Sequence, residues 1–188
     1  MAKRSLRETG MDTLTAVVAL AAVLVVVDRY VHPVLTTPEP DAGGVERALV
    51  GLRPPTLRVT EAVTHRAAAM PFRASGRQLV LLFRTTCPAC ERTRPQWERI
   101  AAAIPAAVPV NAISKENVEA PYFAGARIRV WQAASPTALR QAFPSPFVPT
   151  TLILSPDGRV EYARVGVLGA AAADSIAAIL AGRLAAAR

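Results

Sequence analysis

A continuous apolar run that leads directly into two closely spaced cysteines most constrains how this chain can fold. Residues Gln78–Phe83 read QLVLLF, and the sequence CPAC follows at residues 87–90. An apolar run of this length without polar alternation is typical of a strand buried on both faces of a sheet. After the cysteines, apolar side chains recur at helical spacing, at Trp97, Ile100 and Ile104. The pattern predicts a central strand, a cysteine pair and a helix in direct succession.

The rest of residues 56–188 alternates strand-like and helix-like segments, which predicts an α/β domain with a partly parallel sheet. The turn sequence PDGR at residues 156–159 predicts a hairpin. Further strands are expected at Val108–Ile113, Ile128–Trp131, Thr150–Leu154 and Val160–Val165. Further helices are expected at Glu116–Phe123, at Pro136–Phe143 with Ser135 as its N-cap, and at Ala170–Leu184.

Composition excludes several classes of protein. With 52% hydrophobic and 19% charged residues, the chain of 188 residues can bury a core and is not intrinsically disordered. It has two cysteines and two histidines, too few for a disulfide-stapled mini-protein or for most structural zinc sites. The net charge of +8 comes without a nucleic-acid motif and with only 5% aromatic residues. We therefore expect an anionic lipid surface or an acidic partner, and no nucleic acid.

The N-terminal part of the chain carries an uncharged apolar run at residues 13–27, preceded by Lys3, Arg4 and Arg7. With its flanks, the segment 13–31 is interpreted as a single-pass transmembrane signal anchor. Basic residues before an anchor favour a cytoplasmic N-terminus, here residues 1–12, and an exported remainder. A cleaved signal peptide and a buried core helix are the alternatives. We expect the inner or plasma membrane, with the folded domain in the periplasmic or other extracytoplasmic space.

Between the anchor and the domain, residues 32–55 are punctuated by proline and glycine. Little sustained periodicity is present there, so the segment is interpreted as a linker that holds the domain away from the membrane. The folded domain is expected at residues 56–188.

The cysteine pair has a chemical reason to sit at a helix start. Disulfide exchange needs a thiolate, which the free N–H groups and dipole of a helix N-terminus stabilise. Cys87 takes that place, and Cys90 one turn further on can attack a mixed disulfide on Cys87. Pro88 fits the first helical position because its missing N–H has no partner there. A structural disulfide or half of a zinc site are the alternatives for this pair.

The order of these pieces resembles the thioredoxin fold, a central mixed β-sheet flanked by helices. The matching pieces are the strand, the CPAC sequence, the helix with Pro95, Val148-Pro149-Thr150 before a strand, the PDGR hairpin and Gly166. The resemblance covers roughly residues 75–184. With the N-terminal anchor, the chain is similar to exported TlpA-like redoxins, which include dithiol proteins serving cytochrome c and amine dehydrogenase maturation.

The resemblance implies roles for individual residues. Cys87 matches the attacking cysteine and Cys90 the resolving cysteine, so the redox-active group is a Cys87–Cys90 disulfide and no other cofactor or metal is expected. Pro149 matches a cis-proline that lies against the disulfide. Val148 before it matches the edge that pairs with an extended substrate segment, and Thr150 supports this edge.

Two departures bear on mechanism. At the position of the buried acid that assists the resolving thiol in thioredoxins proper, this chain has Leu81. Glu91 and Glu98 follow on the helix, but neither matches that acid, which leaves the proton acceptor open with water as a candidate. Pro88-Ala89 between the cysteines matches neither strongly reducing nor strongly oxidising relatives, so the direction of electron flow stays open.

The leading functional hypothesis is a membrane-anchored thiol-disulfide oxidoreductase that exchanges disulfides with a protein partner, in cytochrome c or other redox-enzyme maturation. An exported location favours a resting disulfide unless a membrane electron donor reduces it. A peroxidase is disfavoured, because peroxiredoxins carry Thr or Ser where this chain has Arg84. The alternative is a redox-inactive or metal-delivering binding module on the same fold.

Overall fold

The computed structural model describes residues 19–26, 41–70, 72, 74–118, 122–123, 127–145 and 147–184. The chain divides into two compact units, Met1–Pro40 and Asp41–Arg188. In the first unit, residues 19–26 form a helix with exposed apolar side chains. Among the described residues, no helix has both the length and the apolar character to cross a membrane. The other residues of the expected anchor, within 13–31, lie outside the described part.

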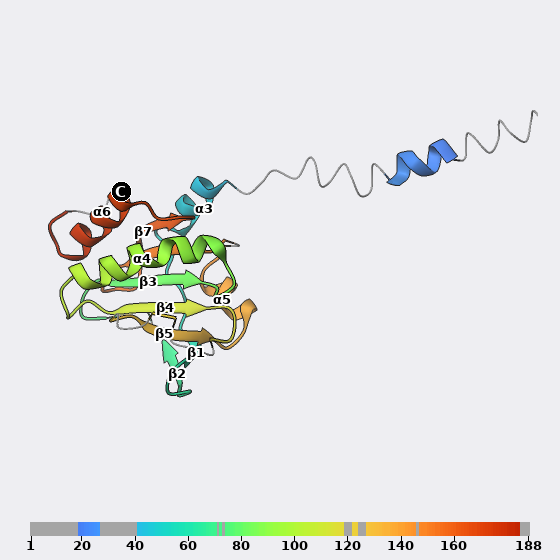
Figure 1. Cartoon of the computed structure of the whole chain (residues 1–188). Coiled ribbons are helices and arrows are strands. Elements are labelled where there is room, and N and C mark those ends of the chain that lie inside the picture. Colours follow the sequence, from blue (N-terminus) through green and yellow to red (C-terminus); the bar gives the residue numbers. More distant parts are fainter. Residues whose placement is uncertain are drawn as a thin grey trace, which may run out of the picture. The chain divides into compact units, whose positions relative to one another are not determined.

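The second unit is built on a mixed sheet of seven described strands, in the order β2-β1-β5-β4-β3-β6-β7 (Figure 1). Their bounds are β1 Leu57–Glu61, β2 Ala67–Met70, β3 Gln78–Phe83, β4 Val110–Ser114, β5 Arg129–Ala133, β6 Thr150–Leu154 and β7 Val160–Val165. β3 pairs in parallel with β4, and β4 with β5, whereas β6 runs antiparallel to β3 and β7. The carboxyl ends of β3, β4 and β5 therefore meet at one edge of the sheet, and the cysteine pair follows β3 there.

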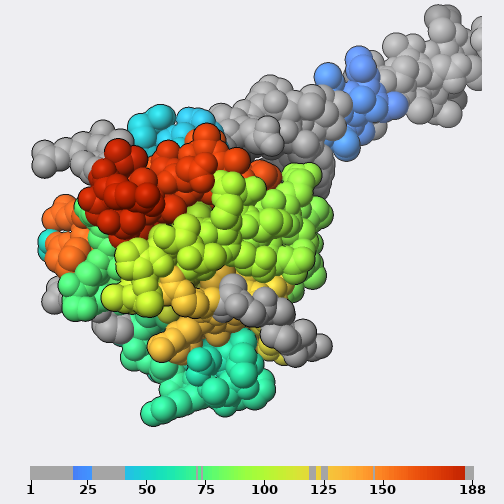
Figure 2. Space-filling model, turned by 60° about the vertical axis from the view of Figure 1, so that its left-hand side comes forward, coloured from blue at the N-terminus to red at the C-terminus, as the bar shows by residue number. Residues whose placement is uncertain are grey.

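Helices cover both faces of this sheet. Their bounds are α3 Ala42–Leu49, α4 Pro88–Ala103, α5 Pro136–Ala142 and α6 Ala170–Leu180. α4 and α6 contact each other and share one core cluster, and Figure 2 shows α6 in red against α4 in yellow-green. Side chains of α3 and α5 belong to the second core cluster on the other face. A mixed sheet with helices on both faces confirms the α/β architecture expected from the sequence.

Strand β3 lies at the centre of both cores. Every residue of β3 is buried. Leu79, Leu81 and Phe83 pack with α4 and α6, while Val80 and Leu82 pack in the cluster that includes α3 and α5. This alternation confirms the prediction of a central strand buried on both faces, and it holds the residues after Phe83 in a fixed place.

The helix after β3 begins at the cysteine pair, as the sequence predicts. Cys87 is its N-cap, Pro95 lies inside it, and Ile104 is its C-cap just before Pro105. The indole N–H of the fully buried Trp97 donates a hydrogen bond to the Thr151 hydroxyl at 2.8 Å. This bond ties α4 to β6.

α3 lies within the stretch expected to be linker, yet it packs on the domain. Its Leu49 side chain is fully buried in the second core cluster. The Glu46 carboxylate accepts a hydrogen bond from the Val165 backbone N–H at 2.8 Å. The compact unit therefore includes residues from Asp41 onward.

The chain just after α3 pairs with β7, the last strand of the sheet. Gly51 N–H donates to the Val160 carbonyl at 2.8 Å, and Val160 N–H donates to the Leu52 carbonyl at 2.9 Å. With the Glu46 contact, these bonds cover part of an edge that would otherwise present free backbone groups.

Three local expectations differ from the structure. Within the expected helix Glu116–Phe123, the described residues 116–118 and 122–123 are not helical. The β1–β2 hairpin was not expected, since its strands are short and the AAAM sequence of β2 has weak strand propensity. α6 ends at Leu180 and not at Leu184, because Gly182 adopts a left-handed φ of +72° that terminates the helix.

Candidate active site

Cys87 caps the N-terminus of α4. Its backbone is extended, with φ −96° and ψ 112°, and its Sγ accepts the Cys90 backbone N–H at 3.4 Å. Its carbonyl oxygen accepts the N–H groups of Cys90 and Glu91 at 3.0 and 3.1 Å. The half-buried Cys87 sulfur therefore lies at the N-terminal end of α4, in contact with the Cys90 backbone N–H.

Cys90 lies one turn further along α4 and is fully buried. Burial raises the pKa of its thiol to about 12, and the neighbouring Cys87 sulfur acts in the same direction. Both cysteines are free thiols in this structure. The two sulfurs therefore differ in accessibility, since an incoming partner can contact Cys87 but not Cys90.

The two residues between the cysteines begin the helix. Pro88 occupies its first position and is exposed, and Ala89 is half-buried. The Thr93 hydroxyl donates to the Ala89 carbonyl at 2.9 Å and accepts the Leu168 N–H at 3.3 Å. The first turn of α4 is thereby tied to the segment before α6.

The Val148–Pro149 segment lies against Cys87. The peptide bond between Val148 and Pro149 is cis, as the resemblance implies. Cys87 Sγ donates to the Val148 carbonyl oxygen at a sulfur–oxygen distance of 3.8 Å. Pro149 is buried and its carbonyl oxygen accepts the Gly166 N–H at 2.8 Å. Val148 is half-buried, which leaves part of this edge facing outward beside the sulfur.

Hydroxyl groups hold the turn before the cis bond in place. The fully buried Thr150 donates from its hydroxyl to the Phe147 carbonyl at 2.9 Å. The buried Ser145 hydroxyl accepts the Phe147 N–H at 3.2 Å. Thr150 therefore supports the edge from behind and is not itself open to a partner.

Glu116 organises the residues that precede Cys87, and the sequence analysis did not identify it. Its carboxylate accepts hydrogen bonds from Arg84 Nε at 2.6 Å, from the Thr85 hydroxyl at 3.4 Å and from the Thr86 hydroxyl at 3.3 Å. Burial alone would raise the pKa of this carboxyl, but the Arg84 guanidinium and the two hydroxyls lower it overall. One sequence feature could have identified Glu116: it is an acidic residue just after β4, a strand that pairs in parallel with β3 and so ends beside it.

Leu81 is fully buried on the face of β3 that packs against α4. Its neighbour across the antiparallel pairing with β6 is Thr151. The structure thus places an apolar side chain where the thioredoxin resemblance implies a buried acid. Proton transfer from Cys90 requires another route.

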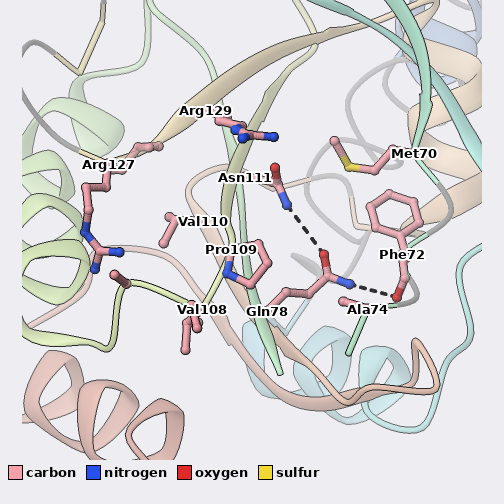
Figure 3. A pocket seen from close by; sticks show the side chains of 13 residues that line it. Met70, Phe72, Ala74, Gln78, Val108, Pro109, Val110, Asn111, Arg127 and Arg129 are labelled. Atoms are coloured by element: carbon pink, nitrogen blue, oxygen red, sulfur yellow. Dashed lines mark hydrogen bonds between the residues drawn. The ribbon is translucent and has the colours of Figure 1, made fainter. Parts of the chain in front are cut away.

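One cavity of the structure is remote from the cysteines. It has a volume of about 640 Å³ and lies at the amino ends of the parallel strands, next to Gln78, Val110 and Arg129 (Figure 3). Gln78 donates to the Phe72 carbonyl at 2.8 Å and accepts from Asn111 at 3.5 Å inside it. Cys87 follows the opposite, carboxyl end of β3. The chemistry of the dithiol therefore does not depend on this cavity.

Metal binding has no evident centre in the described part of the chain. No group of three or more His, Cys, Asp or Glu side chains there could hold a metal ion. The candidate site thus consists of Cys87, Cys90 and the Val148–Pro149 edge.

No protein-family model matches the chain, and no curated protein matches it in sequence. Solved structures do match its fold. StoA from Bacillus subtilis superposes with a TM-score of 0.51 at 15% identity, over 65% of this chain and 95% of StoA. A candidate thiol:disulfide interchange protein, DsbE, from Chlorobium tepidum gives a TM-score of 0.59 at 16% identity, over 72% of this chain and 98% of its own.

A third matching structure is described as a thioredoxin domain. The thioredoxin domain of thiol-disulfide oxidoreductase BVU-2223 from Bacteroides vulgatus superposes with a TM-score of 0.55 at 12% identity, over 70% of this chain and 97% of that domain. At such low identities the likeness establishes the fold alone. The chain therefore has a thioredoxin-like fold, as the resemblance in its sequence implied.

Proposed function

We propose that this chain is a thiol-disulfide oxidoreductase in which Cys87 exchanges disulfides with a protein partner. One observation carries the proposal. Cys87 Sγ caps α4, accepts the Cys90 N–H at 3.4 Å and lies 3.8 Å from the Val148 carbonyl oxygen, beside the cis-proline. The reachable sulfur thus has a backbone edge next to it on which an extended partner segment can lie.

The reaction follows from this arrangement. The Cys87 thiolate attacks one sulfur of a partner disulfide, and the other partner sulfur leaves as a thiolate. Cys90 then loses its proton and attacks Cys87 Sγ, which forms the Cys87–Cys90 disulfide and releases the second partner thiolate. The partner gains two electrons and the dithiol loses them. In the reverse direction the reaction passes through the same mixed disulfide, and the Cys87–Cys90 disulfide oxidises a partner dithiol.

The proposed setting is an exported, membrane-anchored one of the TlpA-like kind. The uncharged run at residues 13–27 behind Lys3, Arg4 and Arg7 supports an anchor with its N-terminus in the cytoplasm. A redox enzyme under maturation, such as a cytochrome c, is the proposed partner, with a membrane reductant as electron donor. Carbonate extraction tests the anchor: the full chain is expected to stay with the membrane and a variant lacking residues 1–31 to be released.

Activity is tested with the full chain in detergent and a peptide disulfide as substrate. Exchange is expected for the wild type and is expected to be absent after Cys87→Ala. Cys90→Ala is expected to stop at the mixed disulfide, which then appears as one added peptide mass on the chain. Because the chain has two cysteines, the trapped adduct can only be on Cys87. No exchange in the wild type would favour a redox-inactive binding module, and full retention of exchange in Cys87→Ala would overturn the role of Cys87.

A further inference from the structure

The resolving step, which rests on the proposed function, leaves one proton without an assigned path. Cys90 is fully buried, and burial holds its pKa near 12, so the thiol stays protonated at neutral pH. Leu81 offers no acceptor. Two other hydroxyls on this face are already engaged, Thr93 with the Ala89 carbonyl and Thr151 with the Trp97 indole.

The Tyr122 hydroxyl is a further polar group beside the core cluster that contains Cys90. Its ring stacks on Phe83, the last residue of β3, with centroids 4.8 Å apart. The Arg94 guanidinium of α4 lies over the Tyr122 ring, 5.2 Å from its centroid. The Tyr122 hydroxyl oxygen is buried and has no hydrogen-bond partner among the described residues. Because an unpaired buried hydroxyl costs about 1–3 kcal/mol, this one calls for a functional reason.

Glu91 connects the site to water. Its carboxylate pairs with Arg94 Nη2 at 3.2 Å, and its side chain is 43% exposed. Burial raises the pKa of Tyr122, and the Glu91 carboxylate and Cys90 raise it further, while Arg94 opposes them. The Glu91 charge also raises the pKa of Cys90. Tyr122 also packs against the core cluster that contains Cys90, and Arg94 contacts both the Tyr122 ring and the Glu91 carboxylate. These contacts gather Cys90, Tyr122 and Glu91 at the start of α4, with Cys87 at its N-cap and Arg94 on its next turn.

We propose that the Tyr122 hydroxyl and the Glu91 carboxylate carry the proton of the buried Cys90 thiol to solvent during the resolving step. The Tyr122 oxygen accepts the proton from Cys90 Sγ while its own proton passes to a Glu91 oxygen. The Cys90 electron pair forms the bond to Cys87 Sγ, and the bond from Cys87 to the partner sulfur breaks. Protonated Glu91 then releases its proton to water, so that no group is left changed.

The test follows the two steps separately with an aromatic disulfide whose released thiolate absorbs visible light. Attack by Cys87 releases one thiolate, and attack by Cys90 releases the second, which is absent in Cys90→Ala. Glu91→Gln and Tyr122→Phe are each expected to slow the second phase at least about tenfold at neutral pH and to leave the first phase in place. The defect is expected to shrink as the pH rises, because hydroxide then removes the Cys90 proton directly.

Glu98→Gln is the matched control, since Glu98 lies on the same helix without a described ion pair and its change is expected to leave both phases as in wild type. The double variant is expected to be no slower than the slower single variant, because both groups act in one path. A faster second phase in Glu91→Gln would overturn the relay, since it would mean that the Glu91 charge only opposes ionisation of Cys90. Wild-type rates in both variants would also overturn it, whereas a wild-type protein without any second phase would instead overturn the proposed function.

Discussion

The Arg84 guanidinium donates a hydrogen bond to the Glu116 carboxylate at 2.6 Å, which joins the residues after β3 to those after β4. With Thr85 and Thr86 on the same carboxylate, this contact fixes the chain immediately before Cys87. The position of the sulfur at the helix N-terminus thus depends on a side chain that follows the neighbouring strand β4.

Glu116→Gln is expected to slow alkylation of Cys87 by iodoacetamide, because the sulfur then spends less time over the N–H groups of α4. Alkylation is measured in a Cys90→Ala background. Glu161→Gln is the control, because Glu161 pairs with Arg77 at the same 2.6 Å far from the cysteines. Both changes are expected to cost about 0.5–1 kcal/mol of unfolding free energy. Equal alkylation rates in the two variants would contradict the positioning role.

Acid is expected to remove the Glu116 contribution. The pKa of Glu116 in the folded protein lies below its ordinary value of 4.5. Its contribution to the free energy of unfolding is therefore full above about pH 4.5 and is lost as the pH falls through the lowered folded pKa. Denaturant unfolding of wild type and Glu116→Gln should give a stability difference that closes in this window. A difference that is constant down to pH 3 would contradict the assignment.

Alkali is expected to destabilise the reduced protein through Cys90. Its folded pKa is about 12 against an ordinary value of 9.0, so the stability it contributes is full below pH 9 and is lost as the pH rises toward 12. The loss at pH 10 is about 1.4 kcal/mol. The free energy of unfolding in urea is measured at pH 7 and pH 10 for the reduced wild type and for Cys90→Ala. Because the tyrosines titrate in both proteins, the difference between the two pH dependences reports Cys90 alone. Equal pH slopes in the two proteins would show that Cys90 ionises freely.

The core position of α3 is tested by Leu49→Ala. Leu49 is fully buried, whereas Leu184 is 52% exposed. We expect Leu49→Ala to cost about 2–4 kcal/mol of unfolding free energy and Leu184→Ala to cost almost nothing. A Leu49→Ala variant as stable as wild type would indicate that α3 behaves as linker and not as part of the core.

The sequence was sufficient for the central elements because their signals are local. The QLVLLF run, the proline positions around α4 and the PDGR turn each determine backbone structure over a few residues, and β3, α4 and the β6–β7 hairpin lie where these signals predict. The resemblance also implied the cis bond before Pro149, which the structure shows.

The remaining features depend on contacts between distant segments. Glu116 is separated from Arg84 by a helix and a strand, and only the parallel pairing of β3 with β4 brings them together. Tyr122 reaches Phe83 in the same way, from a segment expected to be helical. α3 carries glycines near its start and reads as linker, and it is stabilised by burial of Leu49 and not by helix propensity.

The pairing of Gly51 and Leu52 with Val160, together with the Glu46 contact to Val165, has a consequence for proteolysis. A protease cut that removed residues 41–52 would leave the outer-edge backbone groups of Val160 and Val165 in β7 unpaired. An uncovered strand edge accepts a strand from another copy, so the trimmed domain would tend to self-associate. Cleavage before Asp41 would leave this cover intact, so a domain with a protected β7 edge is expected only from cuts upstream of α3.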